Sequence, residues 1–478
     1  MTFYQVLLQL AVTPLYLKYL GLDGYGVIGF YLVLLGMAAV LDTAVSGAVC
    51  REIAWLKAKK EEEGQIPTLV FSTERAFWAL VACLAAAFVG LASLYGKDWF
   101  PESDRIQNQV RQIGWLIGAS FFASFPAGFY NGILNGHQKQ VEAGLLGALA
   151  QTVRGLGAVA IIALILPDLR LFFVWNLVTG IFQTALLRRA AMRCLDLPGV
   201  IPPFSWKAVE SLRGFAGGMF AITGFSGISL YADRIILSKF IPLSEYGIYV
   251  LIGTVLAGFS RMVTPLTLYF TPLMTAQAAS GGHRKMIDQL QVFFGWLCVL
   301  LVPPLVIFSL FSDMILALWT QNPLLFSGTQ KLSLLLAAGF LLQSACYPIT
   351  TVLYAENRIS GVLRGAVGLA VATPLALAII IPRHGGQGAA LTLALIALAH
   401  FLYILTIGSR ALKNSLFFLG RNLCLSVLGT LVLASFAYLP GIVSSSRLLI
   451  LTAILLLCFF GNLLLVLGLK KYSRTFSP

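Results

Sequence analysis

Apolar stretches long enough to cross a bilayer recur from one end of the chain to the other, and they leave little freedom in how it folds. A transmembrane helix needs about 20 consecutive, mainly apolar residues, because each residue adds about 1.5 Å and the hydrocarbon core is about 30 Å thick. Only 11% of the 478 residues are charged, whereas a soluble domain carries about 25%. The sequence therefore predicts an all-α, multi-pass membrane protein.

Fourteen candidate transmembrane helices can be marked along the chain. The connections between them are short, and the longest are residues 51–74 and 189–214, so no segment is long enough to form a separate soluble domain. The first apolar stretch lacks a basic leader and a convincing cleavage site, and we expect it to remain as the first span. The predicted spans are 3–20, 25–50, 75–96, 112–134, 144–166, 171–188, 215–238, 246–273, 290–318, 332–354, 363–381, 388–407, 422–440 and 448–469.

The basic residues in the loops predict an orientation. Of the Lys and Arg near the span ends, 20 fall on one predicted side and 9 on the other. Short cytoplasmic loops are enriched in Lys and Arg, so both termini are predicted to be cytoplasmic. The net charge of +14 is explained by this topology, and we expect no nucleic-acid partner.

Two pairs of short motifs suggest an internal repeat. LDGYG at 22–26 matches LSEYG at 243–247, and LNGHQK at 134–139 falls on AENRIS at 355–360, with the same offset of 221 residues. An offset of six spans preserves orientation in the membrane, so the halves would be parallel repeats, an arrangement that transporters use to form two bundles. Alternatively, the matches reflect only the preference of turns for Gly, Asn and Asp.

The predicted organisation has four parts. Residues 1–190 would form an amino-terminal six-helix bundle and residues 191–214 a cytoplasmic linker. Residues 215–410 would form a second six-helix bundle, and residues 411–478 would hold helices 13 and 14 with a cytoplasmic tail.

Five charged residues lie deep in the predicted spans, where a charge is costly and usually functional. They are Asp42, Arg154, Asp233, Arg234 and Arg261. Adjacent helical residues point about 100° apart, so Asp233 and Arg234 do not simply neutralise each other. The surplus of Arg predicts an anionic substrate, because the planar guanidinium matches phosphate geometry. The alternative is internal pairing, in which Asp233 holds Arg154 or Arg261.

Other residues have structural interpretations. His400, alone among apolar neighbours, is expected to hydrogen-bond a neighbouring helix. The seven Cys are scattered singly without metal-ligand spacing. No nucleotide-binding loop, nucleophile motif or zinc motif occurs in the sequence. We therefore expect no enzyme activity, no cofactor and no metal.

Four segments resemble a known family of lipid transporters. They are YLGLDGYGVIGF at 19–30, LDTAVSGAVCREIA at 41–54, YADRIILSKFIPLSEYGIYV at 231–250 and YFTPLMTAQ at 269–277. The chain resembles the polysaccharide-repeat flippases, the Wzx-type O-antigen and capsule transporters of the multidrug/oligosaccharidyl-lipid/polysaccharide exporter superfamily. The likeness covers most of the chain in the number and spacing of spans, and residues beyond about 360 match in hydropathy only.

The resemblance implies a function and a location. Such a protein moves undecaprenyl-diphosphate-linked oligosaccharide from the inner to the outer leaflet of the bacterial cytoplasmic membrane, by alternating access coupled to a proton or sodium gradient. It serves lipopolysaccharide or capsule synthesis, and the polymerase and chain-length regulator of the same pathway are candidate partners.

The resemblance also assigns roles to some residues. Asp233 and Arg234 match the Asp-Arg pair of the seventh span, and Asp42 with Arg51 matches the acidic-then-basic pattern of the second. Arg154 and Arg261 match no fixed motif and are nominated on depth and charge alone. The expected roles are substrate binding for Arg154, Arg234 and Arg261, and ion coupling or charge pairing for Asp42, Arg51 and Asp233.

Three other functions compete with this interpretation. A multidrug exporter of the same superfamily would favour carboxylates in its cavity, and the deep surplus here is Arg. A lipid II flippase shares a cationic cavity and a fourteen-span plan. A membrane-embedded polymerase would need a large outer loop, which this sequence lacks.

Overall fold

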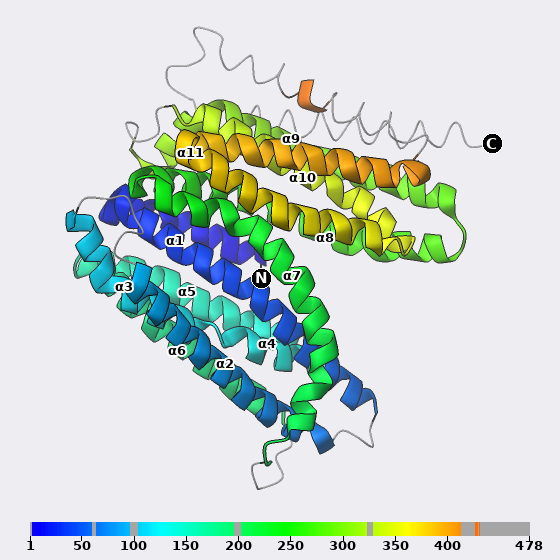
Figure 1. Ribbon diagram of the computed structural model, residues 1–478, viewed down its shortest axis with the longest axis horizontal. Helices are drawn as coiled ribbons and strands as arrows, with labels where there is room; N and C mark the ends of the chain where they lie inside the picture. The colour runs from blue at the N-terminus through cyan, green and yellow to red at the C-terminus, as the bar shows by residue number, and fades with distance from the viewer. Residues whose placement is uncertain are drawn as a thin grey trace. The chain divides into compact units, whose positions relative to one another are not determined.

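The computed structural model describes residues 2–59, 64–95, 104–195, 202–322, 328–412, 426–428 and 430, and no β-strand occurs among them. These residues form eleven α-helices of ten residues or more (Figure 1). The helices are α1 (Thr2–Ala58), α2 (Ile66–Tyr95), α3 (Asp104–Ser124), α4 (Ala127–Gly136), α5 (Gln140–Leu164), α6 (Leu169–Met192), α7 (Trp206–Phe240), α8 (Leu243–Ala279), α9 (His283–Thr320), α10 (Gln330–Ala355) and α11 (Ile359–Leu412). The predicted all-α membrane fold is confirmed.

The described helices do not by themselves give a count of fourteen spans. Within the described part of the chain, nine helical segments are long and apolar enough to cross a membrane. Two of these segments are much longer than one crossing requires: α1 has 57 residues and α11 has 54, and each holds two predicted spans. Predicted span 422–440 lies almost entirely outside the described residues, and span 448–469 lies wholly outside them.

Both long helices fold back on themselves at a glycine. Gly21 in α1 has φ 71° and Gly385 in α11 has φ 54°, values that glycine adopts without steric cost. In α11, the Tyr403 hydroxyl donates to the Gly361 carbonyl at 2.8 Å, a contact between residues 42 positions apart. The predicted spans 363–381 and 388–407 are therefore two antiparallel arms of one hairpin.

The amino-terminal hairpin is shown by two aromatic contacts. Tyr16 packs edge-on against Phe172 and Tyr31 edge-on against the adjacent Phe173, each with ring centroids 5.3 Å apart. In a straight helix, Tyr16 and Tyr31 would stand about 22 Å apart. Because both reach neighbouring residues of α6, the chain must reverse between them, at Gly21.

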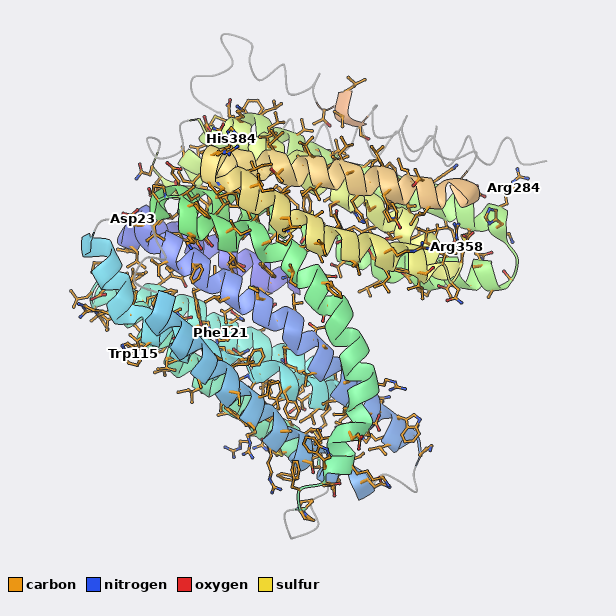
Figure 2. All side chains as sticks on the ribbon, in the orientation of Figure 1. Asp23, Trp115, Phe121, Arg284, Arg358 and His384 are labelled. Carbon is orange, nitrogen blue, oxygen red and sulfur yellow. The ribbon has the colours of Figure 1, made fainter. Side chains whose placement is uncertain are left out.

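The helix ends between residues 251 and 412 follow the predicted alternation of loops. Arg284 and Arg358, both in predicted inner loops, lie at one end of the helices, and His384, at the bend of α11, lies at the opposite end (Figure 2). An ion contact of 3.7 Å between His283 and Glu356 joins the two loops at the first end. In the other hairpin, Asp23 marks the bend of α1 (Figure 2).

An aspartate caps the start of α6, and a proline separates α3 from α4. Asp168 accepts a hydrogen bond from the Arg170 amide at 2.8 Å and so caps the amino terminus of α6, as Asp commonly does. The short PDLR connection thus separates two helices, as predicted. Pro126 separates α3 from α4, so the predicted span 112–134 consists of two helical pieces.

The two matching motifs pack against each other. A Cβ atom on Gly26 would overlap the Leu243 carbonyl oxygen, and one on Gly247 would lie 2.8 Å from the Leu22 carbonyl oxygen. Leu22 and Leu243, like Gly26 and Gly247, are separated by the repeat offset of 221 residues. Each motif therefore makes the same contact with the other, which is the pattern of a two-fold interface and supports the parallel repeats.

The chain forms two compact units, Met1–Val250 and Leu251–Pro478, here called unit 1 and unit 2. In unit 1, Phe77 stacks on Phe125 and Phe129 at centroid distances of 5.6 and 5.1 Å, inside a core that joins α1, α2, α4 and α6. In unit 2, Phe270 of α8 stacks on Phe293 of α9 at 4.8 Å. The bundle boundaries predicted at 190, 214 and 410 remain a prediction.

Candidate functional site

The Arg154 side chain lies inside unit 1 among neutral partners. Its Nη2 atom donates to Ser124 Oγ of α3 at 3.1 Å and to Gln183 Oε1 of α6 at 2.8 Å. Its Nε atom is buried and has no hydrogen-bond partner among the described residues. Tyr16 and Tyr31 lie close enough to interact electrostatically with the guanidinium. This arrangement keeps a positive charge in an apolar helix bundle without an acidic partner in hydrogen-bond contact.

Small residues let the helices around Arg154 approach closely. A Cβ on Gly157 would overlap the Trp175 ring, and one on Gly180 would lie 2.6 Å from Ser124 Oγ. Close approach at small residues is typical of membrane helix interfaces. Trp175 Nε1 then donates to the Val153 carbonyl at 3.1 Å, which fixes α6 against α5 beside the arginine.

The Asp233 carboxylate is held by a tyrosine. Asp233 is 5% exposed, and its Oδ2 accepts a hydrogen bond of 2.7 Å from the Tyr249 hydroxyl. Its Oδ1 has no hydrogen-bond partner among the described residues. The sequence allowed Asp233 to pair with Arg154 or Arg261; the structure instead ties it from α7 to α8 through Tyr249.

The neighbouring Arg234 interacts with aromatic rings. Its Cζ atom lies 5.9 Å from the centroid of the Tyr231 ring, a distance at which a cation is attracted to the ring face. Tyr246 and Asp233 are also among its electrostatic neighbours. A Cβ on Gly36 of α1 would overlap the Tyr231 hydroxyl, so the tyrosine beneath Arg234 rests on α1.

The Asp42 carboxyl group packs directly on the backbone of α4. A Cβ atom on Gly128 would overlap Asp42 Oδ2, so the position of the carboxyl group requires glycine there. Asp42 Oδ1 is buried and has no hydrogen-bond partner in the described part of the chain. Asp42 therefore contacts the α3–α4 segment at Gly128. Arg154 contacts the same segment at Ser124, four residues earlier.

Two further candidates are exposed side chains. Arg51 on α1 and Arg261 on α8 are both exposed. In unit 2, His400 Nδ1 is 3.3 Å from Gln343 Oε1 of α10, so this histidine bonds a neighbouring helix as the sequence analysis expected.

One buried charge was missed by sequence reasoning. Glu74 is placed by its sequence at a helix entry, where a charged side chain can reach the interface, but it is only 5% exposed. Its Oε1 accepts hydrogen bonds from the Tyr130 hydroxyl at 2.6 Å and from Arg188 Nε at 2.7 Å. Trp78 Nε1 in turn donates to the Tyr130 hydroxyl at 3.0 Å. The signal was a single acid, followed by Arg75, close to the apolar residues of a predicted span, but its partners lie 56 and 114 residues away.

Comparison with known proteins gives a consistent picture. The chain is 22% identical over 343 residues to "Putative O-antigen transporter" of Shigella flexneri, covering 70% of this chain and 77% of that protein. No protein-family model matches the chain.

Solved structures share the fold at low identity. "Lipid II flippase MurJ, inward closed conformation" matches with a TM-score of 0.72 at 14% identity, covering 99% of this chain and 98% of that one. An inward-facing multidrug resistance MATE family transporter of the MOP superfamily matches with a TM-score of 0.66 at 13% identity, covering 86% and 96%. The chain therefore has the fold of MOP-superfamily transporters, and the resemblance stated from the sequence is confirmed.

Proposed function

We propose that this multi-pass membrane protein, with its MOP-superfamily fold, is a flippase for lipid-linked oligosaccharide. It would move undecaprenyl-diphosphate-linked repeat units from the inner to the outer leaflet by alternating access coupled to a proton or sodium gradient. The bacterial cytoplasmic membrane, with both termini on the inner side, is the proposed location.

One observation carries this proposal above the others: Arg154 is held inside an apolar helix bundle by neutral groups. Its guanidinium hydrogen-bonds Ser124 and Gln183, so its charge is left for another anion. Retaining an uncompensated cation in a membrane span is costly unless it serves a function. A diphosphate or an acidic sugar supplies the matching charge and geometry.

The other nominated residues divide by charge. Arg234 and Arg261 are proposed to contact the anionic part of the substrate at different stages of transport. Asp42 and Asp233, each with one buried and unpaired carboxyl oxygen, are proposed to couple transport to the ion gradient. Arg51 is proposed as a charge-pairing residue.

A lipid II flippase is the second candidate. The match to a lipid II flippase structure extends over 99% of this chain, and that substrate would also present a diphosphate to the arginines. A multidrug exporter remains the third candidate, since a MATE transporter shares the fold.

The deciding experiment uses a strain that lacks the gene, with and without a plasmid copy. Undecaprenyl-diphosphate-linked oligosaccharide and surface polysaccharide are measured together. The proposal expects the lipid-linked repeat to accumulate and the surface polymer to disappear, with both effects reversed by the plasmid. Loss of growth with accumulated lipid II would favour the lipid II flippase. Unchanged glycolipids with greater sensitivity to cationic drugs would favour the exporter.

The same assay tests the arginines. Arg154→Ala is expected to lower surface polymer at least about 10-fold, because one charged hydrogen-bonded contact is worth about 1.5–3 kcal/mol. Arg284→Ala, at an exposed position in the first turn of α9 (Figure 2), is the matched control and should leave polymer unchanged. Normal polymer with a properly inserted Arg154→Ala protein would remove Arg154 from the substrate site.

A further inference from the structure

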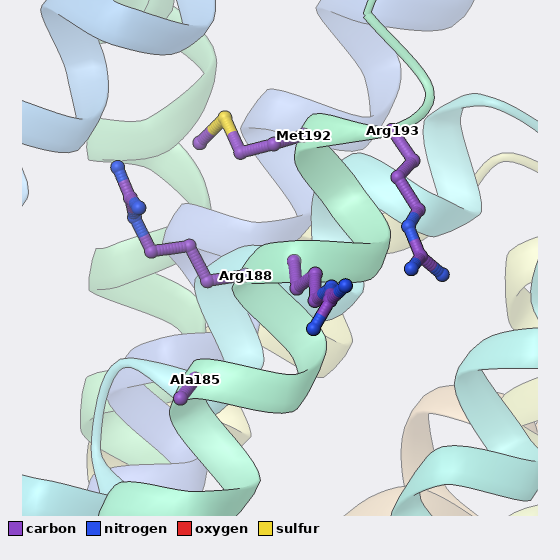
Figure 3. A pocket seen from close by; sticks show the side chains of 5 residues that line it. Ala185, Arg188, Met192 and Arg193 are labelled. Atoms are coloured by element: carbon purple, nitrogen blue, oxygen red, sulfur yellow. The ribbon is translucent and has the colours of Figure 1, made fainter.

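A shallow pocket lies beside the carboxyl end of α6, and three arginines line it. The pocket has a volume of about 440 Å³. Figure 3 shows the side chains that line it. Its lining consists of Ala185, Arg188, Arg189, Met192 and Arg193. All five belong to one helix end, so the pocket lies wholly within unit 1.

Two of the three charges have no acidic partner in the described part of the chain. Arg188 is fixed by Glu74, with Nε 2.7 Å from Oε1, while half of its side chain stays exposed. Arg189 and Arg193 are exposed, and neither forms an ion pair with another described residue. The end of α6 therefore presents a net positive charge, in a position where the helix dipole also favours cations.

An exposed apolar stripe runs along α6 towards this pocket. Val174, Val178, Ile181 and Phe182 are 41%, 50%, 56% and 44% exposed. Their spacing of three and four residues continues through Ala185 to Arg189, so all of them share one face of the helix. From Val174 to Ala185 the stripe is about 17 Å long, close to the roughly 15 Å thickness of one leaflet's hydrocarbon.

We propose that this surface is a binding site for one anionic phospholipid of the leaflet that faces the carboxyl end of α6. The lipid phosphate would accept hydrogen bonds from Arg189 and Arg193. Arg188, which its ion pair with Glu74 holds in place, would form one side of the pocket. The acyl chains would lie along the stripe. Guanidinium groups bind phosphate with paired hydrogen bonds, and basic pockets on membrane proteins hold anionic head groups in this way.

The surface itself favours a resident phospholipid over a transported lipid. The pocket is built by a single helix, with its lining side chains on one face, and the stripe that leads to it is exposed. A bound lipid can therefore exchange with the bilayer without any helix movement. The site does not depend on the proposed flippase function.

Purified full-length protein in detergent tests the site by native mass spectrometry with added phosphatidylglycerol or cardiolipin, and phosphatidylcholine as the neutral lipid. The test variant is Arg189→Gln/Arg193→Gln. The control is Arg284→Gln/Lys285→Gln, which removes two exposed charges from the first turn of α9. The site variant is expected to bind the anionic lipids about 10-fold more weakly, and the control to bind them as the wild type does.

Further arms separate this site from general charge attraction. Phe182→Ser should also weaken anionic lipid binding if the acyl chains lie on the stripe, and Arg189→Lys/Arg193→Lys should restore part of it. Equal losses in the site variant and the control, or no loss in either, would overturn the proposal. Displacement of phosphatidylglycerol by an equal amount of undecaprenyl diphosphate would also overturn it, because the site would then belong to a diphosphate lipid. Full competition by inorganic phosphate would show that the acyl chains contribute nothing.

Discussion

Among the described residues, unit 1 buries charged side chains in addition to the hydroxyl groups that both units bury. The buried charged side chains of the described chain are Glu74 and Asp233, and both belong to unit 1. The buried polar side chains described in unit 2 are the hydroxyl groups of Ser and Thr. The described parts of the two units therefore differ in whether they bury charge.

The difference lies in what the polar groups connect. In unit 2, Ser309 and Thr392 donate to carbonyls one turn earlier in the same helix, at 2.7 and 2.8 Å. These bonds satisfy the hydroxyl without joining helices. In unit 1, Glu74 joins α2 to α4 and α6, and Asp233 joins α7 to α8. We infer that buried charged side chains tie helices together in unit 1, whereas unit 2 relies more on apolar packing. The described ties between helix segments in unit 2 that involve Tyr403 and His400 are made by neutral partners.

The strongest test of this comparison is in unit 2. Phe293→Ala removes a fully buried ring that stacks on Phe270 at 4.8 Å. Large-to-small changes of this kind cost about 3–5 kcal/mol. We expect the largest loss of stability here, measured by denaturant unfolding in detergent. Leu395→Ala, at a side chain 56% exposed, is the control; a similar loss there would show that the method does not resolve core packing.

The corresponding change in unit 1 removes a charge instead of volume. Glu74→Gln deprives Arg188 of its anionic partner and weakens the bond from Tyr130. Breaking a fully buried pair costs about 3–5 kcal/mol, but half of the Arg188 side chain is exposed to solvent. We therefore expect a loss of about 2 kcal/mol by the same measurement. A loss below about 0.5 kcal/mol would contradict the view that polar ties fix unit 1.

An effect of similar or smaller size is expected at Asp233. Tyr249→Phe removes the hydroxyl that donates to Asp233 Oδ2 and leaves a buried carboxyl group with one fewer partner, at a cost of about 1–3 kcal/mol. Thermal unfolding of the purified variant measures the loss. Asp233→Asn/Tyr249→Phe should lose less than the sum of the single variants, because the two residues share one bond. Additive losses would mean that the bond contributes nothing.

The smallest effect is expected from the hydroxyls of unit 2. Thr392→Val keeps the shape of the side chain and removes only the bond to the Gly388 carbonyl. Because that bond stays within one helix, we expect a change within about 0.5 kcal/mol. A change as large as that of Tyr249→Phe would erase the distinction between the two units.

The sequence predicted the helices better than the contacts between them. Span 290–318 lies inside α9 and span 332–354 inside α10, because apolar length is a property of neighbouring residues. The bends at Gly21 and Gly385 were expected only as loops, since one residue with positive φ suffices to reverse a helix. Pro303 and Pro348 lie inside helices, so proline alone did not mark the breaks.

The candidate site was predictable in its charges but not in its partners. Asp42, Arg154, Asp233 and Arg234 stood out because charges are rare in apolar spans. Gln183, which holds Arg154, is 29 residues away and is one of many polar residues near a span. Its role depends on how α5 and α6 pack, and a single sequence does not encode that in any local pattern.

The contact between LDGYG and LSEYG has a consequence for how the two halves of the chain change. In a dimer of identical chains, one mutation alters both sides of a two-fold contact at once. Here Gly26 and Gly247 are encoded separately, so each side changes alone. The motifs already differ in this way: Asp23 and Gly24 in one correspond to Ser244 and Glu245 in the other. Within unit 1, the two motifs keep a symmetric contact while their electrostatic properties differ.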